Sequence, residues 1–422
     1  MGKTMAEKIF QAHNGGKEVK TGEIVFANVD LVMGTDATVP LAIGEFEKIG
    51  KAVFDPAKVV LVQDHFVPAR DTNTANLSNQ MRQFARKHGI THHVEVGRGG
   101  ICHHYVPDSG LCNPGDLIIG ADSHTTTYGA FGALGTGVGS TDFAAAMATG
   151  RLWFKVPPAI KVVLTGKKKK YVQGKDIILK LISMIGVDGA AYKSLEFTGP
   201  SLKHLDMADR ITICNMAVEA GAKAGIFEVD DVTADYFKKY HKKKDILRLK
   251  ADADAEYVQE IPISISDLEP LVAEPYLPSK VKGVKELQEI AVDQVFIGSC
   301  TNGRMEDMRQ AAKILSKRRV HPDVRLIVIP GTYAILEEMA EEGIMETFIA
   351  AGASVQSPTC GPCCGGHTGI LGDDEVCLST SNRNFVGRMG SPSSRVYLAN
   401  PAVAAASAVA GKIIHPEDLC NE

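Results

Sequence analysis

The chain has 422 residues, and 45% of them are hydrophobic. A single hydrophobic core stops growing at roughly 250–300 residues, so this length favours two or three domains. The charged fraction of 23% and the 41 glycines are typical of a folded α/β enzyme, and they exclude a disordered chain. A net charge of −4 provides no electrostatic attraction to nucleic acid or to a membrane surface.

The amino-terminal residues 1–10 lack the apolar stretch of a signal peptide, and no run approaches the roughly 20 apolar residues of a membrane span. Nine cysteines, an odd number at irregular spacings, favour reduced thiols and metal chemistry over a disulfide framework. These features predict a cytoplasmic protein. Two basic runs, 167–170 and 238–244, are expected to be solvated surface, and an RNA-binding regulator remains a remote alternative.

Breaks in the pattern divide the chain into three segments. Residues 1–158 alternate short apolar strands with helices and end at a Val-Pro-Pro sequence. Residues 159–283 hold two amphipathic helices and finish in a charged, proline-containing linker. Residues 284–422 alternate strands and helices again and carry most of the cysteines discussed below. This order of elements predicts an α/β fold of three subdomains.

Three short strand-like runs, mostly apolar, lie in the first segment, and each leads to a histidine-bearing polar cluster. The runs are 59–63, 94–96 and 117–120, and they lead to Asp64-His65, to His103 and to Asp122-Ser123-His124. Such runs are typical of buried parallel strands, and ligands bind at the carboxyl ends of those strands. One histidine there is more often structural, but three in succession predict a catalytic site. A carboxylate beside an imidazole favours its protonated form, which suits general acid catalysis by His65.

The cysteines predict a metal centre. A Cys-x-x-Cys turn holds Cys360 and Cys363, and Cys300 lies in a Gly-Ser-Cys-Thr-Asn-Gly-Arg sequence. One alternative is a zinc site that His367 closes as the fourth ligand. The other is an iron–sulfur cluster with three cysteines, which leaves one iron open as a Lewis acid. The adjacent Cys364 is expected to point elsewhere, as a packed thiol.

Three stretches together resemble the iron–sulfur domain of the aconitase family. They are Gly298–Arg304, the turn of Cys360 and Cys363, and Ser381–Arg388. The resemblance covers nearly the whole chain and is closest to the branch that isomerises isopropylmalate. It implies a three-layer α/β/α fold, with three subdomains around a central [4Fe-4S] cluster on Cys300, Cys360 and Cys363.

The reaction that the resemblance implies is reversible removal and re-addition of water on a 2-hydroxy di- or tricarboxylate. Isopropylmalate is the first substrate expected, ahead of homocitrate or homoaconitate, citramalate and dimethylmalate. His65, oriented by Asp64, would protonate the departing hydroxyl, and Glu219 would assist the water at the iron. His103, Asp122 and His124 would hold the hydroxyl and bound water. The expected substrate-binding residues are Ser123, Asn215, Asn382, Arg383 and Arg388.

Some of these positions have plainer interpretations. Asn215 and Glu219 lie four residues apart on one face of the helix predicted at 208–220, where a solvated edge is the common case. Without the surrounding motif, Arg383 and Arg388 would be surface arginines. The family usually carries glutamine where this chain has His104, which we expect to alter hydrogen bonding around the site.

The resemblance also implies a partner. The family needs a mobile fourth domain that supplies a serine as the base for the C–H bond and an arginine for a carboxylate. Only 34 residues follow Arg388, too few for such a domain. Ser393-Ser394-Arg395 is expected to form a turn, not to replace that serine. We therefore expect a separate small subunit that closes the active site.

Overall fold

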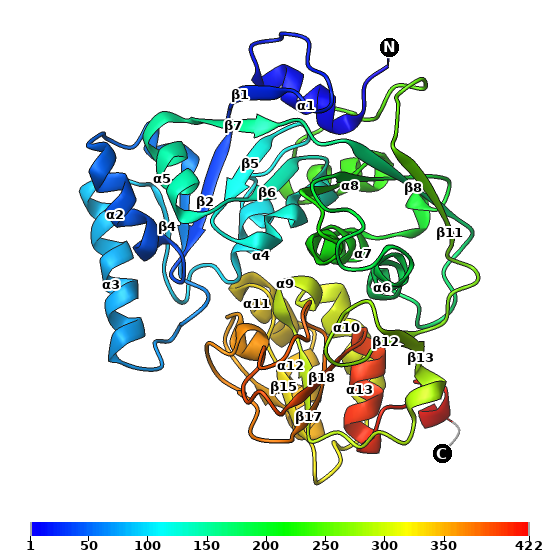
Figure 1. Ribbon diagram of the computed structural model, residues 1–422. Coiled ribbons are helices and arrows are strands. Elements are labelled where there is room, and N and C mark those ends of the chain that lie inside the picture. The colour runs from blue at the N-terminus through cyan, green and yellow to red at the C-terminus, as the bar shows by residue number, and fades with distance from the viewer. Residues whose placement is uncertain (1, 421–422) are drawn as a thin grey trace.

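The computed structural model describes residues 2–420, which form three sheets of four or more strands and one two-stranded ribbon. In Figure 1 the amino-terminal and middle parts of the chain, blue to green, lie together in the upper half. The last part, yellow to red, lies beneath them, and the amino and carboxyl ends lie at opposite sides of the molecule. Among these residues no helix is both long and apolar enough to cross a membrane.

The first sheet has five parallel strands in the order β4-β3-β2-β5-β6. These strands are His92–Val94, Val59–Val62, Leu31–Thr35, Leu117–Gly120 and Leu134–Gly137. The accompanying helices are α1 (Met5–His13), α2 (Val39–Ile49), α3 (Thr72–Lys87), α4 (Cys102–Asp108) and α5 (Ser140–Thr149). The ribbon pairs β1 (Ile24–Asn28) antiparallel with β7 (Arg151–Lys155).

Alternate side chains of this sheet enter two separate hydrophobic clusters. Val60 and Val62 belong to one cluster, and Val59 and Leu61 to the other. A strand buried on both faces reads as a continuous apolar run because helices cover both sides of the sheet. The sheet is therefore the middle layer of three, as the sequence predicted.

The strand expected at 94–96 is misplaced by two residues, since β4 is His92–Val94. Glu95 instead turns the chain: its Oε1 accepts the backbone N–H of Val96 at 3.1 Å, and its Oε2 pairs with Arg82 of α3 at 2.7 Å. A side chain that binds its own backbone in this way competes with strand pairing.

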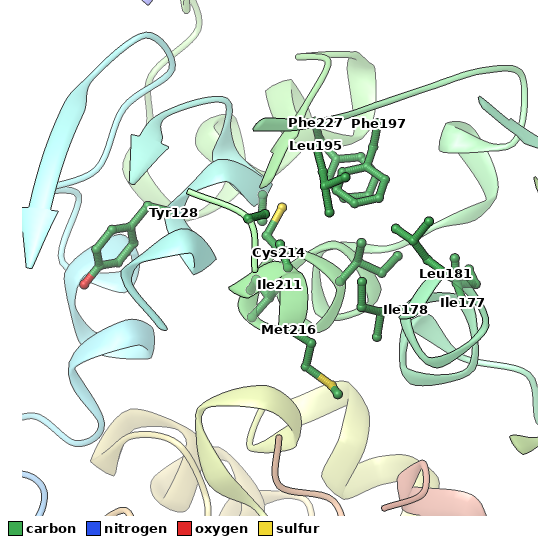
Figure 2. Packing of buried hydrophobic residues seen from close by; sticks show 14 of the residues in the cluster. Tyr128, Ile177, Ile178, Leu181, Leu195, Phe197, Ile211, Cys214, Met216 and Phe227 are labelled. Atoms are coloured by element: carbon green, nitrogen blue, oxygen red, sulfur yellow. The ribbon is translucent and has the colours of Figure 1, made fainter. Parts of the chain in front are cut away.

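The second sheet has four parallel strands in the order β10-β9-β8-β11. They are Ala224–Phe227, Ser194–Thr198, Ala159–Thr165 and Gln259–Ser264, with helices α6 (Gly174–Ile185), α7 (Met207–Asn215) and α8 (Asp231–His241). Figure 2 shows the core between this sheet and the helices, where the rings of Phe197 and Phe227 stack at 4.8 Å. The helix expected at 208–220 is α7 followed by a 3-10 turn, η4 (Met216–Ala220).

The third sheet has seven strands in the order β13-β12-β18-β17-β14-β15-β16. They are Val281–Gly283, Leu271–Ala273, Arg395–Leu398, Val376–Ser379, Gln294–Ile297, Arg325–Val328 and Ser354–Val355. The helices are α9 (Ser299–Asn302), α10 (Met305–Leu315), α11 (Tyr333–Glu341), α12 (Ile344–Ala351) and α13 (Pro401–Ala410). The remaining 3-10 turns outside the site are η1 (Pro56–Lys58), η3 (Leu202–His204), η5 (Val284–Leu287) and η7 (Asp418–Cys420).

The domain boundary expected between residues 283 and 284 does not coincide with the edge of the third sheet. Strands β12 and β13 precede it in sequence, yet β12 pairs with β18 of the third sheet through Ala273 and Leu398. The segment therefore adds an antiparallel edge to that sheet and is not only a linker. Both faces of the third sheet are also buried, since Phe296 enters the cluster shared with the other two sheets while Val295 and Ile297 enter a cluster of their own.

Candidate active site

The carboxyl ends of neighbouring strands in the first sheet bring the predicted histidine clusters together. Strand β3 leads directly to Asp64 and His65, and β5 leads through Ala121 to Asp122. His103 lies in the first turn of α4, which follows β4. Because β3 lies next to β4, and β2 separates β3 from β5, the three segments open at the same edge of the sheet.

Asp36, at the end of β2, fixes the turn that carries His65. Its Oδ1 accepts the backbone N–H groups of Asp64 at 3.1 Å and of His65 at 2.9 Å, and its Oδ2 accepts that of Phe66 at 2.9 Å. Burial, followed by the charge of Asp64, raises the pKa of this carboxyl. We did not predict Asp36 from the sequence, although an acidic residue after an apolar strand was the available signal.

Asp64 orients His65. Its Oδ1 lies 2.7 Å from His65 Nδ1, and its Oδ2 accepts the backbone N–H of Cys102 at 2.8 Å. Burial lowers the pKa of His65, but the Asp64 carboxylate outweighs it and holds that pKa well above its usual value. His65 is thus kept protonated, with Nε2 directed away from Asp64 and 3.6 Å from Asp122 Oδ2.

Asp122 lies among all three histidines. Its Oδ1 is 3.1 Å from His103 Nε2 and accepts the backbone N–H of His124 at 2.7 Å. Burial raises the pKa of Asp122, but His103 and then His124 outweigh it, so the pKa falls well below the usual range. Asp122 is therefore the charged acceptor that orients the imidazoles.

Glu219 and Asn215 connect this cluster to the rest of the site. Glu219 Oε1 lies 2.9 Å from His124 Nε2 and accepts Arg383 Nε at 2.7 Å. Asn215 Oδ1 accepts Asn382 Nδ2 at 3.0 Å. Both side chains are buried, Asn215 at the end of α7 and Glu219 in η4, so they do not form a solvated helix edge.

The thiols of Cys300, Cys360 and Cys363 come from two segments that follow strands of the third sheet: Cys300 lies in the short helix α9 after β14, and the other two follow β16. Cys360 caps the start of the 3-10 turn η6 (Gly361–Cys364) and Cys363 lies within it, so these two residues, three apart, lie on the same side of the turn. The hydroxyl of Ser299 lies 3.8 Å from the Sγ atoms of both Cys300 and Cys363. Asn382 Nδ2 donates to Cys300 Sγ at 3.3 Å.

A single cavity of about 230 Å³ gathers these groups. It is lined by Thr38, His65, Cys102, His103, Ala121, Asp122, Ser123, His124, Cys300, Cys360, Cys363, Cys364, Asn382, Arg383 and Arg388. Among the predicted residues, Asp64, Asn215 and Glu219 do not line the cavity but contact side chains that do. The expectation that Cys364 points elsewhere is wrong, because this half-buried thiol also lines the cavity, at the end of the turn.

The spacing of the thiols bears on the kind of metal centre. Within residues 2–420, Asp64, His65 and Cys360 form the one set of three His, Cys, Asp or Glu residues whose ligand atoms all lie within 4.8 Å of one another. The sulfurs of Cys300, Cys360 and Cys363 do not all lie within 4.8 Å of one another. A single zinc ion would hold its sulfurs about 3.8 Å apart. His367 does not line the cavity, and its Nε2 lies 2.6 Å from the carbonyl oxygen of Pro68. At least one pair of the three sulfurs therefore lies farther apart than the sulfurs of a single zinc site.

The fold and this cavity define an α/β enzyme whose site combines thiols, histidines and paired carboxylates. The chain belongs to the aconitase family: the model of that family, described as aconitate hydratase, matches residues 7–290 and 280–411. Members of the family typically use an iron–sulfur cluster, and this chain has the cysteines for one.

Curated relatives carry a more specific name. The chain is 57% identical over 420 residues to the 3-isopropylmalate dehydratase large subunit of Moorella thermoacetica, covering 99% of this chain and 100% of that one. It is 57% identical over 418 residues to the same subunit of Caldicellulosiruptor bescii, covering 99% and 97%. The crystal structure of Thermococcus kodakaraensis aconitase X (holo-form) has the same fold, with a TM-score of 0.51 at 12% identity over 85% of this chain and 84% of that chain.

Proposed function

We propose that this chain is the large subunit of a hydro-lyase that interconverts 2-isopropylmalate and 3-isopropylmalate in leucine biosynthesis. The observation that carries the proposal is the 57% identity, over nearly the full length, to curated 3-isopropylmalate dehydratase large subunits. The cavity supports the same reaction class, because one site holds the His65 imidazole with its raised pKa, the three proposed ligand thiols among its five cysteines, and two arginines.

Cys300, Cys360 and Cys363 are the proposed ligands of a [4Fe-4S] cluster. All three line one cavity, and their spacing exceeds that of a single zinc site. A cluster bound by three cysteines supplies a Lewis acid for the hydroxyl that leaves the substrate. The eight cysteines whose side chains the structure describes are all free thiols, which suits a reducing compartment such as the cytoplasm.

His65 is the proposed general acid for the departing hydroxyl. Its Nδ1–H donates to Asp64, and the raised pKa of His65 favours a second proton on Nε2, which lies 3.6 Å from Asp122 Oδ2 of the cavity lining. His103 and His124 are positioned by Asp122 to hold the hydroxyl and water in the cavity. Glu219, through His124 and Arg383, would assist the transfer of protons to and from that water.

The arginines are proposed to hold the substrate's carboxylates. Arg383 uses its Nε to bind Glu219, and no protein hydrogen bond within residues 2–420 engages its two terminal nitrogens. A guanidinium held at one edge can bind a carboxylate with its other edge, as a fork of two hydrogen bonds. Arg388, Ser123 and Asn382 line the same cavity and complete the proposed binding set.

A small subunit is the proposed source of the base for the C–H bond. The relatives are each named as a large subunit. Ser393 and Ser394 do not line the cavity, and Ser394 Oγ donates to the carbonyl oxygen of Ser391 at 2.6 Å. The proposed subunit supplies a serine and an arginine and closes the site over the substrate.

The decisive experiment is anaerobic turnover by the chain reconstituted with iron, sulfide and its small subunit. Isopropylmalate is expected to be the best of a panel that includes homoaconitate, citramalate and 2,3-dimethylmalate. A higher kcat/KM for another acid of the panel would assign the chain to a different branch of the family.

The cluster ligands are tested by separate Cys→Ser variants. Cys300→Ser, Cys360→Ser and Cys363→Ser are expected to lose iron and visible absorption, whereas Cys364→Ser keeps both. A full cluster in Cys360→Ser, or loss only in Cys364→Ser, contradicts the ligand set.

A further inference from the structure

Lys175 is a completely buried lysine in the first turn of α6. Its Nζ donates to the carbonyl oxygens of Thr380 at 2.8 Å and Ser381 at 2.7 Å, and it lies 3.4 Å from Met216 Sδ. No carboxylate of residues 2–420 lies within ion-pair distance of Nζ. Burying an ammonium without a carboxylate partner costs several kcal/mol, so such a residue needs an explanation.

The partners of Lys175 belong to the loops that hold the site. Thr380 Oγ1 accepts the backbone N–H of Gly298 at 2.9 Å, and the carbonyl oxygen of Thr380 also accepts the hydroxyl of Thr301 at 2.8 Å. These contacts fix the chain on both sides of Cys300. Asn382 and Arg383 follow directly after Ser381, so the same ammonium anchors the start of the loop that carries them.

Met216 reaches the same place from the second sheet. In Figure 2 its side chain points away from the stacked Phe197 and Phe227 and toward the ribbon of the third part of the chain. Its sulfur contacts Lys175 Nζ, and Met216 directly follows Asn215, which binds Asn382. Lys175 therefore lies where the second and third sheets meet, behind the cavity.

Burial lowers the pKa of Lys175 to about 7, against the raising effect of Asp307, Cys300, Cys363 and Asp176, so nearby negative charge decides how fully the amine is protonated. Asp307 is occupied by Asn302 Nδ2 and the backbone N–H of Arg304. Asp176 is occupied by backbone N–H groups and by Asn400. The two thiols are the groups that become anionic when a metal binds, so cluster binding would provide the counter-charge that Lys175 lacks.

We propose that Lys175 is a positioning residue that supplies a buried positive charge to the cluster and anchors the loop of Asn382 and Arg383. This rests on the proposed cluster at Cys300, Cys360 and Cys363. A positive charge near a cluster stabilises its reduced, more negative form, because net charge and hydrogen bonding set the reduction potential. The same charge slows release of the anionic cluster.

Two substitutions separate the charge from the hydrogen bonds. Lys175→Met removes both, whereas Lys175→Gln keeps a hydrogen-bond donor and removes only the charge. Lys180→Met, at an exposed position of the same helix, is the matched control. The reduction potential of the anaerobic protein is measured by dye-mediated titration with EPR detection, and iron release is timed with a chelator.

Both Lys175 variants are expected to have a more negative potential and several-fold faster iron release, with Lys180→Met unchanged. Lys175→Met alone is expected to raise KM more than it lowers kcat, because it also frees the loop of Arg383. The cluster-free Lys175→Met protein is expected to melt at the same temperature as wild type or higher, because the uncompensated charge is gone.

Unchanged potential and iron release in folded Lys175→Gln would overturn the role of the charge. A wild-type chain that binds no iron–sulfur cluster would overturn both this inference and the proposed function. A normal wild-type cluster whose reduction potential is unchanged from wild type in both Lys175 variants would overturn this inference alone.

Discussion

Glu219 Oε1 lies 2.9 Å from His124 Nε2 and 2.7 Å from Arg383 Nε. His124 follows the first sheet, Glu219 belongs to η4 beside the second, and Arg383 follows the third. A single carboxylate oxygen therefore links three parts of the chain at the cavity. It also holds the His124 ring and the Arg383 guanidinium in fixed directions, which a neutral amide would do less strongly.

Glu219→Gln is expected to lower turnover by roughly 10²–10⁴-fold, the range typical of acid–base groups, and to leave the cluster in place. The neutral amide oxygen binds both partners more weakly than the charged carboxylate oxygen does, so His124 and Arg383 are held less firmly in place. Steady-state kinetics and visible absorption of the anaerobic complex measure the two effects. Glu337→Gln, at an exposed position of α11, is the control. Loss of the cluster together with turnover would assign Glu219 a structural role instead.

His65→Asn is expected to keep the fold and the proposed cluster and to lower turnover by roughly 10²–10⁴-fold, because the proposed general acid is removed. The spectral change of the cluster on adding substrate should persist. His367→Asn serves as the control, because His367 lies outside the cavity. Near-normal turnover by His65→Asn would remove His65 from the mechanism.

The sequence revealed those parts of the site that local spacing determines. Short strand-like runs followed by Asp64, His103 and Asp122 predicted that these side chains lie at one edge of a sheet. The three-residue spacing of Cys360 and Cys363 predicted that their thiols converge. Strand β12 escaped prediction, because its three residues are held by pairing with β18, far along the chain.

Buried supporting groups were also beyond the sequence. Asp36 and Lys175 form hydrogen bonds with backbone atoms of segments distant in sequence. From sequence alone, a charged residue is normally interpreted as a surface residue. Their partners become visible only when the segments are folded together. The half-buried place of Cys364 likewise depends on where the η6 turn ends.

His104 is expected to position Cys300 through the backbone. Its Nε2 lies 3.2 Å from the carbonyl oxygen of Ser299, a non-glycine residue with a φ of 74°. Burial lowers the pKa of His104 to about 3, so the ring is neutral and Nε2 carries the proton that this acceptor requires. His104→Leu is expected to lower stability by about 1–3 kcal/mol and to reduce iron content, because a buried carbonyl loses its donor.

His104→Gln, whose amide can replace the Nε2–H, is the matched variant and is expected to retain most of the stability and most of the iron content. Thermal unfolding and iron analysis distinguish the two variants. Equal losses in His104→Gln and His104→Leu would show that ring packing, not the hydrogen bond, matters at this position.

Glu196 is expected to make stability depend on pH at a place remote from the cavity. Its carboxylate accepts the backbone N–H groups of Met5 at 3.0 Å and Ala6 at 2.9 Å and the hydroxyl of Tyr257 at 3.0 Å. Burial raises the pKa of Glu196 from 4.5 to about 7, against the lowering effect of these hydrogen bonds. Because the folded protein binds the proton more tightly, this contribution to stability is complete below about pH 4.5 and is lost as pH rises to about 7.

The loss amounts to roughly 3 kcal/mol at about 1.4 kcal/mol for each pKa unit. Urea unfolding at several pH values should therefore show a steeper dependence in this window for wild type than for Glu196→Gln. Asp176, whose pKa burial also raises to about 7, adds the same trend to both proteins and so cancels in the comparison. Parallel curves would mean that Glu196 keeps its ordinary pKa.

Ser394→Ala is expected to leave turnover of the complete complex unchanged. Ser394 is buried, its Oγ donates to the carbonyl oxygen of Ser391, and it does not line the cavity. A serine that acts as a base must reach the C–H bond of the substrate, and this one is engaged in a turn. The cluster-loaded chain alone is expected to be inactive, and adding the small subunit should restore turnover. Isomerisation by the single chain that Ser394→Ala abolishes would place the base on this chain and remove the need for a partner.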